Sequence, residues 1–539
     1  MEGLPLDLWH WGLALAPLLL LLVLLVGLRW TAPEAGPIGM FLAIGIAFLA
    51  FDAPAEVIAI AGGKGMWDAV FVLYVVWSAL LLYRVVERAG GFHALREGIS
   101  EFSRNDLFLV LGFGWVFASF LQGIAGFGVP IAVVAPLLVG LGVKPLYAVV
   151  IPLIGHAWAN LFGTLAVAWL ATTRVVNLDD PVRTALETAI LLWIPNLLAG
   201  VAIAWLYGRG EALRMALPLI LIVSAIHGGG QLAMSLVQPV LAGFVPAALA
   251  LVALYPLSHW RRYSEPDEDI DRRPAMAEDR QHDERQKEPT MGLGLALLPY
   301  GVVIVSVLAL ALPPVTEALE AFEIGPPFGA AETGLGLEVE AEDAYSPFAP
   351  LTHPGTFLML AAGVAWLVYH LSGHYDAWAE RADTKGLLQG VVDNAIPASV
   401  AVCAFLVMSK VMDDTGQTDV LAGGIAEVAP AAVYAALAAA IGGIGSFMTS
   451  SNTASNILFA PLQVEAAGSI DPLRESTMVA AQNAGGAIGN SISPANVVLG
   501  TGTAGIVGRE GDVLRRVLPW AGASVLLVGA ATVALNWLG

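Results

Sequence analysis

Charged residues and cysteines are both scarce in this chain of 539 residues. Asp, Glu, Lys and Arg make up 13% of the sequence, well below the ~25% of an average soluble domain. The single cysteine, Cys403, lies in an apolar run, which excludes a disulfide framework and indicates a small buried side chain. No HExxH motif occurs and the nine histidines are scattered, so the sequence offers no zinc-hydrolase centre.

Long apolar runs are abundant instead. Hydrophobic residues make up 57% of the chain, and they cluster in blocks of the roughly 17–25 residues needed to cross a bilayer. Such blocks are residues 11–28, 66–83, 185–206, 241–257, 291–312, 354–371 and 517–538. The sequence therefore predicts an all-α polytopic membrane protein with about 12–14 transmembrane helices, some of them broken. Glu2 and Asp7 stand where a signal peptide would carry basic residues, so we expect the first helix to be retained.

The charge balance is acidic and poor in lysine. The net charge is −20, and the 25 basic residues include only five lysines. This balance argues against nucleic acid as a partner. An acidic, lysine-poor surface also suits a high-salt cytoplasm, so a halophilic source is a further hypothesis.

Two polar segments indicate how the chain is oriented in the membrane. Residues 260–290 hold seven Lys or Arg beside ten Asp or Glu, with almost no apolar periodicity, which predicts a disordered linker. Residues 313–350 hold eight acidic residues and no Lys or Arg. Because loops that carry Lys and Arg favour the cytoplasm, we expect 260–290 to be cytoplasmic and 313–350 to be extracellular.

The chain also repeats itself weakly, at an offset of about 326 residues. RVVERAGGFHALREGI at 84–99 aligns with KVMDDTGQTDVLAGGI at 410–425, with basic and acidic positions matched. SFLQG at 119–123 aligns with SFMTS at 446–450. An internal duplication of this length is typical of transporters built from two halves. Chance similarity between apolar helices is the alternative.

Counting spans outward from the acidic loop places Lys410 outside and Arg84 inside, so we expect the two halves to have inverted topology. The first repeat is predicted at 66–259 and the second at 386–539. The remaining segments, which would be peripheral spans, are 1–65 and 291–385.

A polar stretch interrupts the apolar runs at the same place in each half. QGIAGFGVP at 122–130 and TSSNTASN at 449–456 are rich in small or hydrogen-bonding residues and carry no charge. This pattern predicts a broken or re-entrant helix, because irregular backbone at membrane depth must be satisfied by protein or by a water-filled cavity. Gly126 and Gly128 permit a tight turn, and hydroxyl or amide side chains can cap a half-helix.

The N-terminus of a half-helix attracts a carboxylate without any Lys or Arg. Two such ends facing each other would form a neutral anion site near the middle of the membrane. The residues expected to bind the anion are Gly126, Gly128, Ser450, Ser451, Asn452, Thr453, Ser455, Asn456, Asn490 and Ser493. Close packing of helices through small residues is the alternative explanation.

Further amides follow at 482–496, and the aligned part of the first half contains a histidine and an asparagine. Amide and hydroxyl oxygens suit a small polar solute or a sodium ion. The residues expected near a coupling ion are Gln122, His156, Asn160, Gln482 and Asn483. His156 aligns with Gln482, although a hydrogen-bonded packing role is the alternative for a lone intramembrane histidine.

Three segments resemble signature sequences of the lactate permease family. They are GIAGFGVPIAVVAPLLVGLGVKPLYA at 123–148, TSSNTASNILFAPLQ at 449–463 and AAQNAGGAIGNSISPANVV at 480–498. The resemblance extends over most of the chain from about residue 66 and is loosest at 260–350. It implies transport of L-lactate, and often glycolate, across the cytoplasmic membrane by proton symport.

The chain departs from the family pattern at charged positions. Gln122 and Asn452 stand where the family commonly has acidic residues, and Asn490 stands at a common lysine. His156 replaces an asparagine. Amides do not titrate in the physiological range, so two options remain. Another group carries the proton, such as His156 or, at span ends, Asp413 and Glu87, or sodium is the coupling ion.

We therefore expect an ion-coupled secondary carrier for L-lactate and related short 2-hydroxy monocarboxylates, driven by H+ or Na+ and working without a cofactor. A carrier or channel for another small organic anion is the alternative. An enzyme would need a pair such as Ser491 and His156, and nothing in the sequence supports one. Tight dimers are common among elevator-type carriers, so a homodimer is one arrangement to test.

Overall fold

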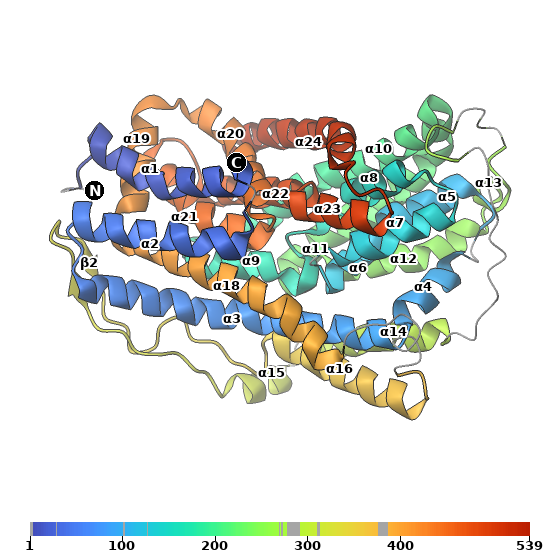
Figure 1. Cartoon of the computed structure of the whole chain (residues 1–539), viewed down its shortest axis with the longest axis horizontal. Coiled ribbons are helices and arrows are strands. Elements are labelled where there is room, and N and C mark those ends of the chain that lie inside the picture. Colours follow the sequence, from blue (N-terminus) through green and yellow to red (C-terminus); the bar gives the residue numbers. More distant parts are fainter. Residues whose placement is uncertain are drawn as a thin grey trace.

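The computed structural model describes residues 4–28, 30–100, 103–126, 128–268, 270, 273–277, 291–309, 313–375 and 386–538. Most of this chain is helical, and its long helices run side by side along the longest axis of the molecule (Figure 1). The strands are one short antiparallel pair, β1 (Ala331–Glu332) and β2 (Glu338–Val339). The predicted all-α polytopic fold is confirmed.

Residues 55–258 form a series of helices in which long spans alternate with short, broken ones. In chain order these are α3 (Ala55–Arg88), α4 (Gly91–Ser100), α5 (Asp106–Leu111), η2 (Gly112–Phe117), α6 (Ala118–Ile124), α7 (Val129–Gly140), α8 (Pro145–Gly155), η3 (Ala157–Ala159), α9 (Gly163–Val175), α10 (Pro181–Ser224), η4 (Ala225–Gly229), α11 (Gly230–Val237), η5 (Pro239–Leu241) and α12 (Phe244–Ser258). Gly208 and Arg209 leave the helical conformation, so α10 consists of two helices joined at a bend.

Residues 387–538 follow a similar order. Their helices are α18 (Leu387–Asp414), α19 (Gln417–Val428), α20 (Ala431–Thr449), α21 (Asn452–Ser469), α22 (Glu475–Ser491), α23 (Pro494–Thr503) and α24 (Glu510–Leu538). The other helical elements are α1 (Leu8–Leu22), η1 (Val23–Gly27), α2 (Ala32–Ala50), α13 (Arg261–Ser264), α14 (Leu293–Ala309), α15 (Pro313–Glu320) and α16 (Pro354–Leu371).

Ten helical stretches among the described residues are long and apolar enough to cross a membrane, or eleven if the bent pair Pro145–Ala159 and Gly163–Val175 is one span. The sequence predicted 12–14. The difference arises where helices are bent or short. Pro181–Val237 counts as one stretch of 57 residues, and the apolar helices Val129–Gly140 and Leu293–Val307 are too short to qualify.

Helices α3 and α18 pack against each other in opposite directions. A Cβ atom on Gly65 of α3 would lie 2.7 Å from the Cα atom of Val407, in the last third of α18. Near the other end of α3, the Arg84 side chain lies against Gly390, at the start of α18. An inverted repeat requires this relation between its first helices. The repeat itself stays a prediction.

Contacts between the two halves come in matched pairs. Helix α7 contacts α23 while α9 contacts α21, and α8 contacts α24 while α10 contacts α22. In the predicted repeat, α7 corresponds to α21, α8 to α22, α9 to α23 and α10 to α24. Each contact therefore has a counterpart, as a two-fold relation between the halves would produce. These contacts bring the broken helices of both halves together (Figure 1).

The segment after α12 is folded where the sequence predicted a disordered linker. Tyr263 is fully buried, Tyr207 of α10 donates a hydrogen bond to Asp267, and Met276 forms a β-bridge with Val143. The apolar and aromatic residues among the charges explain the difference, because they fill gaps on the first half. Residues 278–290 lie outside the described part of the chain.

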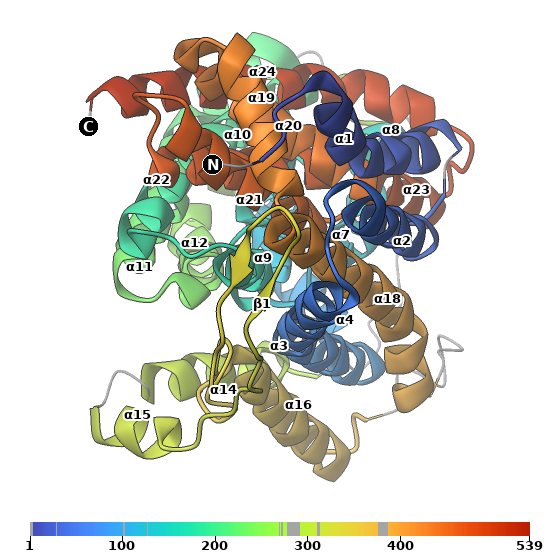
Figure 2. The same cartoon turned by 90° about the vertical axis from the view of Figure 1, so that its left-hand side faces the viewer.

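Residues 313–350 lie across one end of the helices. Their hairpin lies in front of the helix ends when the molecule is viewed from this side (Figure 2). The indole Nε1 of Trp67 donates to the carbonyl oxygen of Ser346 at 3.3 Å, and the Arg174 guanidinium donates to the same carbonyl at 2.5 Å. The loop is therefore attached to α3 and to the end of α9. We call this end of the molecule the acidic-loop face.

Helices α20 and α22 pack with their backbones in direct contact. A Cβ atom on Gly485 would lie 1.8 Å from the carbonyl oxygen of Ala439, and one on Gly489 would lie 2.0 Å from the carbonyl oxygen of Gly443. Small residues permit this approach between membrane helices. The contact holds the amide-rich helix α22 against α20, whose end forms one of the breaks.

Replacing Gly485 by valine is expected to destabilise the protein. The added side chain would overlap the Ala439 carbonyl, and overpacking of this kind costs about 1–3 kcal/mol. The melting temperature in detergent measures the effect. Gly522→Val on α24 is the matched control, because a Cβ there has no neighbour within 4 Å. Equal melting temperatures for the two variants would contradict the backbone contact.

Candidate functional site

Both polar stretches are breaks between helices, as the sequence predicted. Gly126 and Gly128 have φ angles of 45° and 82°, in the left-handed region, and α7 starts directly after Gly128. In the second half, Ser450 has a φ of 53° and ends α20. Ser451 then caps α21, since its side chain accepts a hydrogen bond of 3.1 Å from the backbone N–H of Ala454.

A third break separates α8 from α9 and is strained. Thr164, Leu165 and Ala166 have φ angles of 50°, 49° and 62°. Left-handed backbone costs roughly 1–2 kcal/mol for each residue with a Cβ atom. Strain of this kind persists where the surrounding structure enforces it and is concentrated at functional sites. The break is therefore a candidate moving part of the site.

An amide cluster joins α21, α22 and α9. The side-chain N–H of Asn456 donates to Asn483 Oδ1 at 2.8 Å, and the Thr172 hydroxyl donates to the same oxygen at 3.1 Å. Gln482 Nε2 donates to the Ser455 hydroxyl at 3.1 Å. All five side chains are buried. The cluster contains four of the predicted site residues and connects the two halves, because Thr172 comes from α9.

Asn452 is the first residue of α21 and has unmet hydrogen-bonding capacity. It is 4% exposed, and neither atom of its amide has a hydrogen-bond partner among the described residues. Its Oδ1 lies only 2.3 Å from the position that a Cβ atom on Gly486 would occupy. Two nearby elements carry further unpaired polar atoms, Asn483 Nδ2 and Ser493 Oγ. An unpaired buried polar group costs about 1–3 kcal/mol, so a ligand that pairs with these atoms would be strongly favoured.

The first half reaches this region through Asn160. Asn490 Nδ2 donates to Asn160 Oδ1 at 3.2 Å, and Asn160 Nδ2 donates to the Ala487 carbonyl at 2.9 Å. The start of α7 is also close, because a Cβ atom on Gly128 would lie 3.5 Å from Asn496 Oδ1. The segment between α8 and α9 and the break before α7 therefore both meet the end of α22 and the start of α23.

The remaining predicted residues are placed differently. His156 Nδ1 lies 2.5 Å from the Pro152 carbonyl of its own helix and therefore donates to it. Gln122 is buried against Gly163 at the third break. The Ser450 hydroxyl accepts a 3.4 Å hydrogen bond from the Ala495 N–H, and Thr453 is half-buried. The described contacts do not place His156 or Gln122 in the amide cluster.

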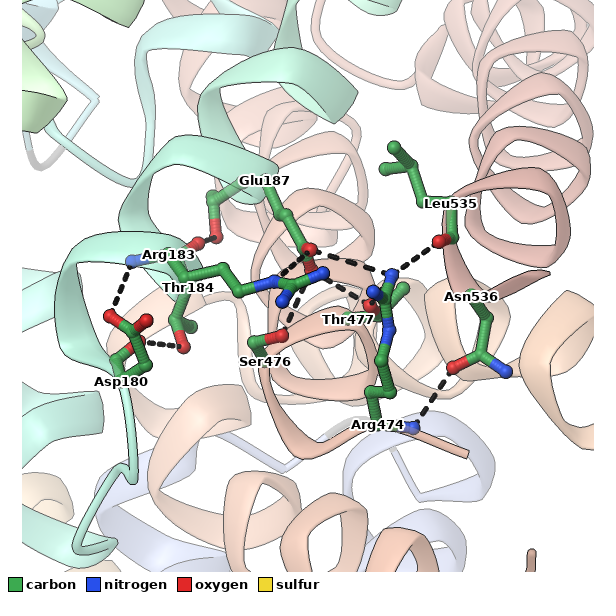
Figure 3. A network of polar contacts seen from close by, with 10 residues as sticks. Asp180, Arg183, Thr184, Glu187, Arg474, Ser476, Thr477, Leu535 and Asn536 are labelled. Atoms are coloured by element: carbon green, nitrogen blue, oxygen red, sulfur yellow. Dashed lines mark hydrogen bonds and ion pairs between the residues drawn. The ribbon is translucent and has the colours of Figure 1, made fainter. Parts of the chain in front are cut away.

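A second polar network joins the halves near the acidic-loop face, where α10 begins (Figure 3). Its centre is the buried carboxylate of Glu187. This group accepts hydrogen bonds from Arg183 at 2.9 Å, Ser476 at 3.2 Å and Thr477 at 2.8 Å, and it forms an ion pair with Arg474 at 3.6 Å. The donors come from α10 and from the start of α22, so Glu187 links the two halves.

Arg474 extends the network to the end of α24. Its backbone N–H donates to Asn536 Oδ1 at 2.9 Å, and its guanidinium donates to the Leu535 carbonyl (Figure 3). The network therefore connects α10, α22 and α24 at this end of the molecule.

The sequence interpretation missed Asp68 and Lys64, which belong to a buried charge cluster at the acidic-loop face. Asp68 of α3 accepts a hydrogen bond of 2.9 Å from the Tyr345 hydroxyl, and Lys64, one turn earlier, pairs with Glu342 at 3.0 Å. Lys410 of α18 lies 5.9 Å from the centre of the Tyr345 ring. A signal was available, because an aspartate inside the apolar block 66–83 is the type of intramembrane charge that usually marks a functional site.

An acidic cavity of about 320 Å³ opens beside this cluster. It is lined by Lys64, Leu337, Glu338, Val339, Glu340, Glu342, Asp413, Asp414, Asp419 and Glu465. Burial raises the pKa of Tyr345 above its ordinary value, so its phenol keeps the proton that it donates to Asp68. Burial also lowers the pKa of His353 to about 3, which keeps this imidazole neutral beside Arg174.

Helices that span a membrane and break around buried, hydrogen-bonding side chains are typical of membrane transport proteins. The L-lactate permease family model matches residues 12–539. The chain belongs to the L-lactate permease family.

Individual relatives agree. The chain is 28% identical to an L-lactate permease of Halalkalibacterium halodurans, over 97% of this chain and 96% of the relative. It is 25% identical to the glycolate permease GlcA of Escherichia coli, over 93% and 91%. These relatives are permeases, so the prediction of a transporter rather than an enzyme is confirmed. The YdaH transporter of Alcanivorax borkumensis resembles the structure with a TM-score of 0.46 and 16% identity, over 89% of this chain and 87% of the other.

Removing the Glu187 carboxylate is expected to separate the halves at the acidic-loop face. Glu187→Ala leaves the Arg474 guanidinium without its carboxylate partner, and breaking a buried pair costs about 3–5 kcal/mol. The loss is measured as a lower melting temperature in detergent. A double-mutant cycle with Arg474→Ala isolates the pair, and additive effects of the two substitutions would contradict the coupling.

Proposed function

We propose that the protein carries L-lactate, and related short 2-hydroxy monocarboxylates such as glycolate, across the cytoplasmic membrane by ion-coupled alternating access. The observation that carries the proposal is the unpaired amide of Asn452, buried at the first turn of α21. A 2-hydroxy acid offers a carboxylate that accepts hydrogen bonds and a hydroxyl that both donates and accepts them. It can therefore satisfy the N–H and the carbonyl of this amide together.

The carboxylate would bind at a neutral site. The N-terminus of α21 carries about half a positive charge and unpaired N–H groups, which favour an anion. Ser493 Oγ, which has no partner at the start of α23, can donate a further hydrogen bond. Gly126 and Gly128 allow the α7 backbone to approach from the first half. The names of the relatives support lactate or glycolate as the ligand.

Alternating access would move the breaks of the two halves relative to each other. The left-handed turn at 164–166 is the element suited to rearrange, because its strain is released if the surrounding contacts change. The Glu187–Arg474 network would be the contact that opens at the acidic-loop face. In this proposal the acidic loop is extracellular, as the distribution of Lys and Arg predicts. An elevator or a rocking movement would both satisfy these contacts.

The coupling ion would be H+ or Na+. Gln122, Asn452 and Asn490 are amides and carry no proton in the physiological range. Uptake of labelled L-lactate into proteoliposomes, under a sodium gradient or a pH gradient of equal driving force, distinguishes the two ions. Uptake under neither gradient, without competition from glycolate, would refute lactate as the substrate and favour a carrier or channel for another small organic anion.

Asn452→Leu is expected to abolish lactate binding and transport, because leucine keeps the volume but removes both polar atoms of the amide. Lactate-induced protection of the protein against thermal unfolding measures binding, and proteoliposome uptake measures transport. The matched control is Asn394→Leu on α18, where the amide is exposed and bonds only its own helix. Normal uptake by Asn452→Leu would refute this placement of the site.

A further inference from the structure

Coupling to a proton needs a buried group that can change its charge, and the amide site contains none. Two carboxylates on described spans are deeply buried, Asp68 at 0% and Glu187 at 5% exposure. Glu187 receives three hydrogen bonds and pairs with two arginines. Its hydrogen-bonding capacity and its charge are therefore both matched by partners.

Asp68 has a different environment. Among the described residues, its Oδ2 accepts one hydrogen bond, from the Tyr345 hydroxyl, and its Oδ1 is buried without a partner. No ion pair to Asp68 is formed within the described part of the chain. A buried carboxylate with an unpaired oxygen is costly when charged, so a proton on Oδ1 would remove an unfavourable buried charge.

Charged groups from three elements face Asp68. Lys410 comes from α18, Arg174 comes from α9, and Tyr345 and Glu342 come from the acidic loop. The Arg174 guanidinium is directed elsewhere, because it donates to Ser346 and stacks 3.6 Å from the centre of the Phe71 ring. Asp68 therefore lies in the positive field of two cations without direct contact to either.

We propose that Asp68 is the proton-binding group that couples lactate transport to a pH gradient. The inference rests on the proposed function, since it assigns the coupling site of that carrier. One proton binds Asp68 and one lactate anion binds the amide site, so the loaded carrier moves no net charge. The proton leaves Asp68 on the other side of the membrane together with the release of lactate.

In this proposal, protons would reach Asp68 from the acidic cavity. Lys64, one helical turn from Asp68, lines this cavity, as do Asp413 and Asp414, which follow Lys410 by three and four residues. A cavity lined by carboxylates concentrates cations at its mouth. The cavity at the acidic-loop face is thus adjacent to both Asp68 and its counter-charge on α18.

The charge state of Asp68 can change the electrostatic potential at the substrate site through α9. Arg174 is two residues from Thr172, which hydrogen bonds Asn483 in the amide cluster. Protonating Asp68 leaves Lys410 and Arg174 less neutralised and raises the positive potential along α9. A lactate anion is favoured by that potential, so binding of the proton and of the anion reinforce each other.

Asp68→Asn tests the proposal, because the amide keeps the shape and cannot titrate. The variant is expected to exchange labelled for unlabelled L-lactate in proteoliposomes without a gradient, as the wild type does. It is expected to lose accumulation driven by a pH gradient, which in the wild type reaches about tenfold for one pH unit with one proton per lactate. Glu56→Gln, an exposed carboxylate on the same helix, should retain both activities.

The outcomes separate this inference from the proposed function. Absence of lactate exchange in the wild type refutes the proposed function itself. Exchange by the wild type, with full pH-driven accumulation by Asp68→Asn, overturns the assignment of Asp68. Accumulation by the wild type under sodium alone also overturns it. Loss of exchange as well as accumulation in a variant with an unchanged melting temperature overturns it too, because Asp68 would then act in binding or movement.

Discussion

Every backbone polar group inside a bilayer must pair with the protein or with water in a cavity, and this constraint organises the structure. A helix can break at membrane depth only where other groups pair with the freed N–H and carbonyl groups. The Ser451 side chain does this for α21, and the Asn160 and Asn496 side chains do it for the end of α22. The breaks therefore collect the hydroxyl and amide side chains of both halves in one buried region.

The same constraint separates the polar site from the charges. The amide cluster is neutral, whereas the buried carboxylates Asp68 and Glu187 lie near the acidic-loop face. Glu187 is fully paired with donors from both halves, so its role is to hold the two halves together. Asp68 has one donor and an unpaired oxygen. The contrast in hydrogen bonding, at similar burial, is the physical basis for giving the two carboxylates different roles.

Close packing supports this arrangement. Helix α22 carries Gln482, Asn483 and Asn490 and is held against α20 by glycine contacts at 1.8–2.0 Å from a notional Cβ. Because α22 also contacts α9 through Asn483 and Thr172, a shift of either half changes hydrogen bonds in the site. The site is therefore coupled to the relative position of the halves.

The sequence by itself determined the helical membrane fold, the breaks at 122–130 and 449–456, and most of the amide cluster, because apolar length and clustered polar residues are local properties. It did not reveal that residues 260–277 pack on the first half, since buried residues such as Tyr263 are few among many charges. It also did not distinguish Gln482 and Asn483, which join the amide cluster, from His156, which bonds its own helix. Only the tertiary structure decided these points, because they depend on contacts between distant segments, such as the hydrogen bond between Thr172 of α9 and Asn483 of α22, which lie 311 positions apart.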